Sequence, residues 1–454
     1  MRSLSWLLLL GGCLAAQTVK DDQHPLRAGC AESDPTLARL KKGDPVKIRF
    51  VLAGSNRPCY SVTAEADGKT VQGYLGADAL EGLEKFDEAR RRASSAVLPA
   101  VSRAITSRPV EEVRQSAGKP NYALAAEVFR AAAALEAGRP AEVEPILAKA
   151  GAPAGHRDVA MLRGSALIEL NQPDRALDLL QPALKEHKKD PQLLALAGLA
   201  SYRLDKPRDA MAYWKESLET RPDPNVTQML AKVEREMGAD KSTQTTYGTR
   251  FLLRYDGAVA DPETARSMVA VLDQEFARVA FQLGCRAEER IITIVQSRTD
   301  YRKTTGSPEW NGGQFDGKIR IPVEAAKRID PETRQTMTHE LVHACISNLG
   351  PWPTWVHEGF AQKLSGEVVG TAQRQKLKEL AKAGKLPKLT ELGEGWSRFS
   401  VEGVALRYAV ALAAVDMLFQ KQGAVAGRNL MNNPEGLPRV TAELDRAMRE
   451  VLSQ

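Results

Sequence analysis

The chain has 454 residues, a length that predicts about two to four domains. Hydrophobic residues make up 43% of it and charged residues 26%, which excludes a largely disordered or low-complexity protein. The 63 basic and 57 acidic residues leave a net charge of only +6, and the basic residues are scattered along the chain. Because a nucleic-acid-binding protein usually concentrates its basic residues, we expect no nucleic-acid partner.

The N-terminus predicts export. Residues 1–16 carry one positive charge, at Arg2, followed by the apolar stretch Leu4–Leu10 and small residues, a pattern typical of a signal peptide. Cleavage after Ala16 would release a periplasmic or secreted bacterial protein. Alternatively, Cys13 lies in a sequence that resembles the bacterial lipobox and would carry a lipid anchor. No later stretch is apolar over the roughly 18 residues that a transmembrane helix needs, so we expect a protein that does not span the membrane.

Four further cysteines fit an oxidising compartment. Proximity in the chain favours one disulfide between Cys30 and Cys59 and another between Cys285 and Cys345. Four buried free thiols are the alternative.

Residues 26–82 predict a small β module. Val46–Val51 alternates apolar and polar residues, Tyr60–Thr63 favours a strand, and Val71–Leu75 follows a turn. This stretch resembles bacterial Src-homology-3-like domains, and the resemblance implies a small all-β barrel that would bind a cell-wall or peptide ligand. A purely structural barrel is the alternative.

Residues 84–238 have helical periodicity and an internal repeat. Six positions carry the same or a similarly sized residue again 34 residues later. The first set is Gly164, Ala166, Leu170, Pro173, Ala176 and Leu180, and the second set is Gly198, Ala200, Leu204, Pro207, Ala210 and Trp214. This period resembles tetratricopeptide repeats, which implies two or three all-α hairpins with a groove for a protein partner. The alternative is that the helices only space and stiffen the protein. The polar stretch Gly238–Thr249 predicts a domain boundary after them.

Residues 245–454 predict an α+β domain. Phe251–Tyr255 favours a strand, and a helix is expected from a cap at Asp261 to a stop at Gly284. Lys318–Val323 predicts a further strand, which its proline confines to a sheet edge.

The next helix contains the pattern His339-Glu340-Leu341-Val342-His343. Its two histidines are four residues apart, so their imidazoles project from one face and can bind the same metal ion. The glutamate lies about 100° around the helix, where its carboxylate can take a proton from a water that zinc makes more acidic. With six histidines in the chain, chance would produce this pattern in about one such chain in a hundred.

A catalytic zinc site needs three protein ligands and an open position. After Gly350 and Pro351 end the helix, the following helix carries His357 and Glu358. On the residues alone, either of these two side chains could be the third ligand.

The motif His339–His343, followed by the motif Trp355–Ala361, resembles the gluzincin metallopeptidases, specifically the bacterial peptidase MA-like family. The resemblance covers about residues 251–423 and implies a zincin-type fold with Glu340 as the catalytic base. It implies one Zn²⁺ per chain on three ligands, His339, His343 and Glu358. It also implies an edge strand that holds an extended peptide, with Lys318, Ile319, Arg320 and Ile321 as candidate substrate-binding residues.

Hydrolysis also needs a hydrogen-bond donor for the oxyanion of the intermediate. Tyr408, at the start of an apolar helix, could donate from its phenol, although a core or capping role is equally open. His357, next to the third ligand, is another candidate. Arg320 is either solvated or favours acidic residues in a substrate.

The sequence therefore predicts a multidomain, exported zinc-dependent peptidase that acts on a peptide or protein substrate. A small β barrel and tetratricopeptide-like hairpins would target an α+β zincin-type domain. Two alternatives stay open: a catalytically silent cell-envelope scaffold that acts through its repeats, and a zinc hydrolase of a non-peptide bond such as a cell-wall amide. Glu340 argues against the scaffold, because a purely structural zinc site has no use for a general base.

Overall fold

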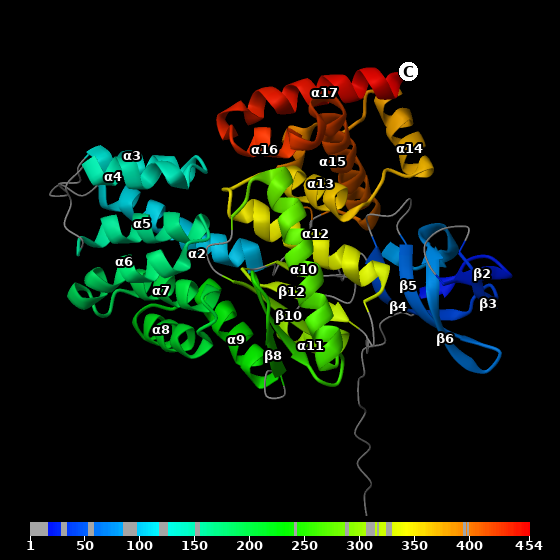
Figure 1. Cartoon of the computed structure of the whole chain (residues 1–454), viewed down its shortest axis with the longest axis horizontal. Coiled ribbons are helices and arrows are strands. Elements are labelled where there is room, and N and C mark those ends of the chain that lie inside the picture. Colours follow the sequence, from blue (N-terminus) through cyan, green and yellow to red (C-terminus); the bar gives the residue numbers. More distant parts are fainter. Residues whose placement is uncertain are drawn as a thin grey trace, which may run out of the picture.

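The chain begins with a curled β sheet, continues as a series of helices, and then forms a second sheet among further helices (Figure 1). The computed structural model describes residues 17–28, 34–52, 59–84, 98–117, 126–149, 155–239, 243–286, 290–305, 314–315, 317–323, 329–393, 396 and 399–454. The predicted signal peptide, with Cys13, lies outside these ranges. Within them, no helix combines the length and the apolar composition needed to cross a membrane.

The N-terminal sheet is antiparallel, with strand order β3-β2-β6-β5-β4-β1-β7. Its first strand begins at Gln17, directly after the predicted cleavage site and before the predicted start of the module. Among the described strands, β3 and β7 stay unpaired with each other, so the sheet curls into a half-barrel without closing. Its strands are β1 (Gln17–Val19), β2 (His24–Arg27), β3 (Thr36–Leu40), β4 (Pro45–Leu52), β5 (Cys59–Ala66), β6 (Lys69–Gly76) and β7 (Leu80–Glu81), with the 3-10 helix η1 (Ala77–Ala79).

The helices that follow lie on the other side of the second sheet from the half-barrel (Figure 1). From α3 to α9 they pack mainly against their neighbours in the chain, whereas α2 also packs against α5, α7 and α9. They are α2 (Leu98–Ala117), α3 (Ala126–Glu136), α4 (Val143–Lys149, after η2, Pro140–Glu142), α5 (Arg157–Glu169), α6 (Pro173–Glu186), α7 (Pro191–Arg203), α8 (Pro207–Thr220) and α9 (Pro224–Ala239).

The 34-residue repeat corresponds to two helical hairpins, α5–α6 and α7–α8. In each hairpin a glycine on the first helix allows close contact with a bulky side chain on the second. A Cβ added to Gly164 would lie 2.9 Å from Leu180, and one added to Gly198 would lie 2.3 Å from Trp214. The repeated small and bulky positions are therefore contacts between the two helices of each hairpin.

The second sheet has the order β11-β12-β10-β9-β8. Its three inner strands are parallel and its outer strands run antiparallel to them: β8 (Thr243–Tyr247), β9 (Phe251–Asp256), β10 (Ile291–Ser297), β11 (Gln314–Phe315) and β12 (Ile319–Val323). The stretch Gly238–Thr249, where the sequence predicts a domain boundary, contains β8, whose five residues belong to this sheet. A domain beginning at residue 245 would cut that strand.

Most of the remaining helices lie on one side of this sheet (Figure 1). They are α10 (Pro262–Leu283), α11 (Arg298–Thr305), α12 (Pro331–Ser347), α13 (Thr354–Ser365), α14 (Thr371–Lys382), α15 (Val401–Gln422), α16 (Ala426–Met431) and α17 (Leu437–Ser453), with the 3-10 helices η4 (Leu389–Leu392), η5 (Gly423–Val425) and η6 (Pro434–Gly436). The predicted limits of α10 are confirmed. The Asp261 side chain accepts a hydrogen bond from the Thr264 amide, and Gly284 ends the helix with φ of 86°.

Alternate residues of the inner strands face opposite sides of the sheet, as the two-residue period of a strand requires. Leu253, Ile319 and Ile321 belong to the hydrophobic core that includes α10 and α12. Arg254, Lys318 and Arg320 belong to the opposite face.

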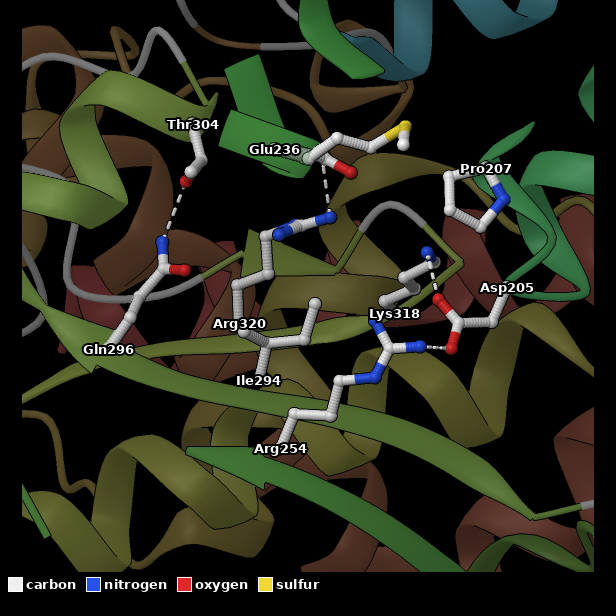
Figure 2. Close-up of a pocket in the computed structure, with 10 residues that line it drawn as sticks. Asp205, Pro207, Glu236, Arg254, Ile294, Gln296, Thr304, Lys318 and Arg320 are labelled. Carbon is white, nitrogen blue, oxygen red and sulfur yellow. Dashed lines mark hydrogen bonds and ion pairs between the residues drawn. The ribbon is translucent and has the colours of Figure 1, made fainter. Parts of the chain in front are cut away.

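Asp205, in the turn between α7 and α8, and Glu236, on α9, lie against that charged face (Figure 2). Lys318 Nζ lies 2.7 Å from Asp205 Oδ1, and Arg254 pairs with the other oxygen of the same carboxylate. Arg320 Nη2 lies 2.8 Å from Glu236 Oε1 of α9. The Lys318 and Arg320 side chains are only 2% and 1% exposed, so these are buried ion pairs between the hairpins and the sheet.

The Cys285–Cys345 disulfide is present and joins the end of α10 to α12, which confirms that prediction. Cys59 is also disulfide-bonded. Cys30, its predicted partner, lies outside the described residues.

Candidate metal centre

Helix α12 presents the two histidines of the motif toward α13. Its N-terminus is capped by Asp330, whose side chain accepts a hydrogen bond from the Thr333 amide. Leu341 and Val342, between the histidines, are fully buried and hold the helix in the core. The rings of His339 and His343 lie 4.8 Å apart on the side that faces α13.

Helix α13 also packs closely against α15, and a glycine makes this possible. A Cβ at Gly359 would lie 2.6 Å from the backbone oxygen of Ala411, so only glycine allows α13 to pack this tightly against α15. Gln362 strengthens the contact by donating a hydrogen bond of 3.1 Å to the Tyr408 carbonyl. Glu358 directly precedes the glycine and is therefore fixed at this helix contact.

Three side chains converge between α12 and α13. Glu358 Oε2 lies 3.5 Å from His339 Nε2 and 3.6 Å from His343 Nε2. Among the described residues, His339, His343 and Glu358 are the group that could hold a metal ion.

The donor set and its spacing suit a zinc ion. Tetrahedral zinc with bonds of about 2.1 Å separates its ligand atoms by about 3.4 Å, close to the two measured distances. Glu358 Oε2 is buried and, in the described part of the chain, has no hydrogen-bond partner. A buried carboxylate oxygen in that position is stabilised by a cation.

Neighbouring charges help to shift the pKa values of the two histidines in opposite directions. Burial disfavours protonation of His339, but the adjacent carboxylates of Glu358 and Glu367, with a further contribution from Glu340, raise its pKa well above the ordinary value. Burial, reinforced by the charges of His339 and His357, lowers the pKa of His343 well below the ordinary value. The site therefore combines three carboxylates with one readily protonated imidazole, and this excess of negative charge favours a cation.

Glu340 and Tyr408 lie beside the three convergent side chains. Glu340 is 6% exposed, and its charge acts on both His339 and Tyr408. Burial, followed by the charges of Glu358, Glu367 and Glu340, raises the pKa of Tyr408 well above its ordinary value, so the phenol keeps its proton. Tyr408 packs edge-on against Trp396, with ring centroids 5.0 Å apart.

His357 lies at the edge of the same cluster. Its ring centroid is 5.7 Å from that of His343, on the helix that carries Glu358. The structure thus brings together all six residues that the sequence predicts as ligands or catalytic groups.

The four predicted substrate-binding residues lie elsewhere. Strand β12 is not the outermost strand, because β11 pairs with it at Ile319 and Arg320. Lys318 and Arg320 are buried against the hairpins, and Ile319 and Ile321 are buried in the core. Both alternatives for Arg320, a solvated side chain and a preference for acidic substrate residues, are therefore wrong, since its guanidinium is buried and pairs with Glu236 inside the protein.

Glu367 is a member of the site that the sequence analysis missed. Its Oε1 lies 3.6 Å from His339 Nδ1, on the nitrogen that faces away from Glu358. The only sequence signal is its place directly after Gly366, the residue that ends α13.

No family model matches this chain, and no curated protein matches it. The geometry of the side chains is therefore the basis for a functional assignment.

Proposed function

We propose that this protein is an exported zinc-dependent peptidase of the gluzincin type, which hydrolyses peptide bonds in a peptide or protein substrate. The observation that carries the proposal is the convergence of His339, His343 and Glu358 at distances that suit one divalent ion, with Glu340 buried next to them. Two imidazoles and one carboxylate are the ligand set of a catalytic zinc that keeps an open position. A buried glutamate beside such a set has the position of a general base.

A zinc ion held by these three side chains would supply Lewis acidity and lower the pKa of a water molecule. Glu340 would accept the proton of the attacking water and pass it to the leaving amine. Tyr408, whose raised pKa keeps the phenol protonated, would donate a hydrogen bond to the oxyanion of the tetrahedral intermediate. His357 is close enough to the cluster to serve as a second donor.

We also propose a domain type for each of the other parts of the chain. The second sheet with α10–α17 would be the zincin-type catalytic domain. The hairpins α5–α6 and α7–α8, with their 34-residue period and their contacts between small and bulky residues, support a tetratricopeptide-like region that binds a protein partner. The half-barrel would be the Src-homology-3-like module. Both would direct the catalytic domain to its target.

Export is supported by cysteine chemistry. The disulfide between Cys285 and Cys345 fits an oxidising compartment such as the periplasm. Whether Cys13 carries a lipid or the chain is cleaved after Ala16 can be read from the mass of the mature N-terminus.

The test combines metal analysis with protein hydrolysis by the purified mature chain. We expect about one zinc per chain and cleavage of a generic protein such as casein. Glu340→Gln should keep the metal and lose about 10²–10⁴-fold in turnover, whereas Glu358→Ala should lose metal. Glu379→Gln, at an exposed position on α14, is the matched control and should change neither property.

Two results would refute the proposal. Full turnover in Glu340→Gln would exclude this glutamate as the base. Zinc binding without any protein hydrolysis would favour the scaffold, or a hydrolase of cell-wall amides if purified cell wall is cleaved instead.

A further inference from the structure

The imidazole of His339 lies between two carboxylates, one at each nitrogen. Nε2 is 3.5 Å from Glu358 Oε2 and faces the candidate metal position, whereas Nδ1 is 3.6 Å from Glu367 Oε1. An imidazole binds a metal through one nitrogen and keeps its proton on the other. The nitrogen that would carry the proton is the one that faces Glu367.

The position of Glu367 is fixed by the way α13 ends. Gly366 adopts φ of 92°, and its amide donates to the Lys363 carbonyl at 3.3 Å, while the Glu367 amide donates to the Gln362 carbonyl at 2.9 Å. These two hydrogen bonds form a Schellman motif, which turns the chain back over the last turn of the helix. The side chain after the glycine is thereby directed toward α12.

Glu367 is also largely withdrawn from solvent. Its side chain is 17% exposed, and its second oxygen is buried with no hydrogen-bond partner among the described residues. A carboxylate loses hydration at such a position and needs a positive or proton-donating neighbour in return. The nearby His339 ring is that neighbour.

We infer that Glu367 is a positioning residue for metal binding: it accepts a hydrogen bond from Nδ1–H of His339 and so holds the Nε2 lone pair toward the metal. This inference rests on the proposed function, because it requires a metal ion at the site. Carboxylates that orient a metal-binding histidine in this way usually contribute a factor of about 10–100 to metal affinity. His343 differs, because the described carboxylate that lies within 4 Å of its ring is Glu358 itself, on Nε2.

The test measures the affinity of the full mature chain for Zn²⁺ alone, by competition with a chromophoric chelator. Glu367→Gln keeps the size of the side chain and removes its charge, so we expect zinc affinity to fall about 10–100-fold. Glu367→Asp keeps the charge and should bind zinc more tightly than Glu367→Gln. Glu379→Gln is the control with the same charge change at an exposed site and should match the parent chain.

Two further readouts separate orientation from stability. The visible absorption spectrum of the Co²⁺-loaded protein should change in Glu367→Gln, because the histidine that it orients is itself a ligand. The melting temperature of the metal-free protein should stay close to that of the parent, which a merely structural role would not predict.

The outcomes distinguish the two proposals. If the parent chain binds no zinc, the proposed function fails and this inference fails with it. If the parent binds zinc and Glu367→Gln binds it equally well with an unchanged cobalt spectrum, the inference alone is overturned. A Glu367→Asp variant that binds no better than Glu367→Gln would also overturn it.

Discussion

The buried ion pairs between the hairpins and the second sheet should make a large contribution to stability, and Asp205→Asn tests this. One carboxylate is shared by Lys318, 2% exposed, and Arg254, 19% exposed. Burial and the nearby charge of Arg320 already lower the pKa of Arg254, so this cation depends on its anionic partner. Without the carboxylate of Asp205, the cations of Lys318 and Arg254 would lie beside that of Arg320, away from most of the solvent.

The structure allows a rough magnitude for this substitution. Removing one partner of a buried ion pair costs about 3–5 kcal/mol, because the remaining charge loses its opposite charge and stays buried. Arg254 keeps some access to solvent, so we expect the free energy of unfolding to fall by about 3 kcal/mol, at the lower end of that range. Asn171 occupies the equivalent turn of the preceding hairpin with φ of 54°, against 61° for Asp205. Asparagine therefore tolerates this backbone, and the change isolates the charge.

Urea unfolding of the full mature chain at neutral pH measures the effect. Asp178→Asn, at an exposed position on α6, makes the same charge change and should alter the free energy of unfolding by less than about 0.5 kcal/mol. Amide hydrogen exchange should also quicken in β9 and β12 of Asp205→Asn. If the two variants are equally stable and exchange alike, the ion pairs do not hold the hairpins on the sheet.

Three other changes test the catalytic region. Tyr408→Phe should keep zinc and reduce turnover by about 10²–10³-fold if the phenol donates a hydrogen bond to the oxyanion. Because the pKa of Tyr408 is raised, its ionisation should cause no loss of activity below about pH 10. A pH–rate profile of both proteins checks these two expectations. Gly359→Ala should lower the free energy of unfolding by about 1–3 kcal/mol and reduce zinc content, since its methyl group would meet the Ala411 carbonyl; equal stability in calorimetry would contradict that contact. Replacing both Cys285 and Cys345 by alanine opens a 60-residue loop and should lower the free energy of unfolding by about 4 kcal/mol, as measured by denaturant titration.

Local signals in the sequence predict much of the region around the candidate site. Asp261 and Gly284 mark the ends of α10 because capping depends on neighbouring residues in the chain. The pairing of His339 with His343 follows from helix geometry alone. These features need no knowledge of what packs against them.

Long-range contacts are the part that the sequence does not predict. Arg254, Lys318 and Arg320 alternate with apolar residues, as on a strand with one face in water, yet the hairpins supply the buried carboxylates that cover them. Glu367 reaches His339 only because α13 packs beside α12 before the chain turns back. No local pattern distinguishes such a glutamate from one in solvent.

The turns of the two hairpins also contact the rest of the protein at two fixed points that are one repeat apart. The Asn171 side chain donates a hydrogen bond to that of Asn348 at the end of α12. Asp205, one repeat later, forms an ion pair with Lys318 of the second sheet. Inserting or deleting a hairpin between these anchors would leave one of them without its counterpart, unlike the free growth of an ordinary repeat array.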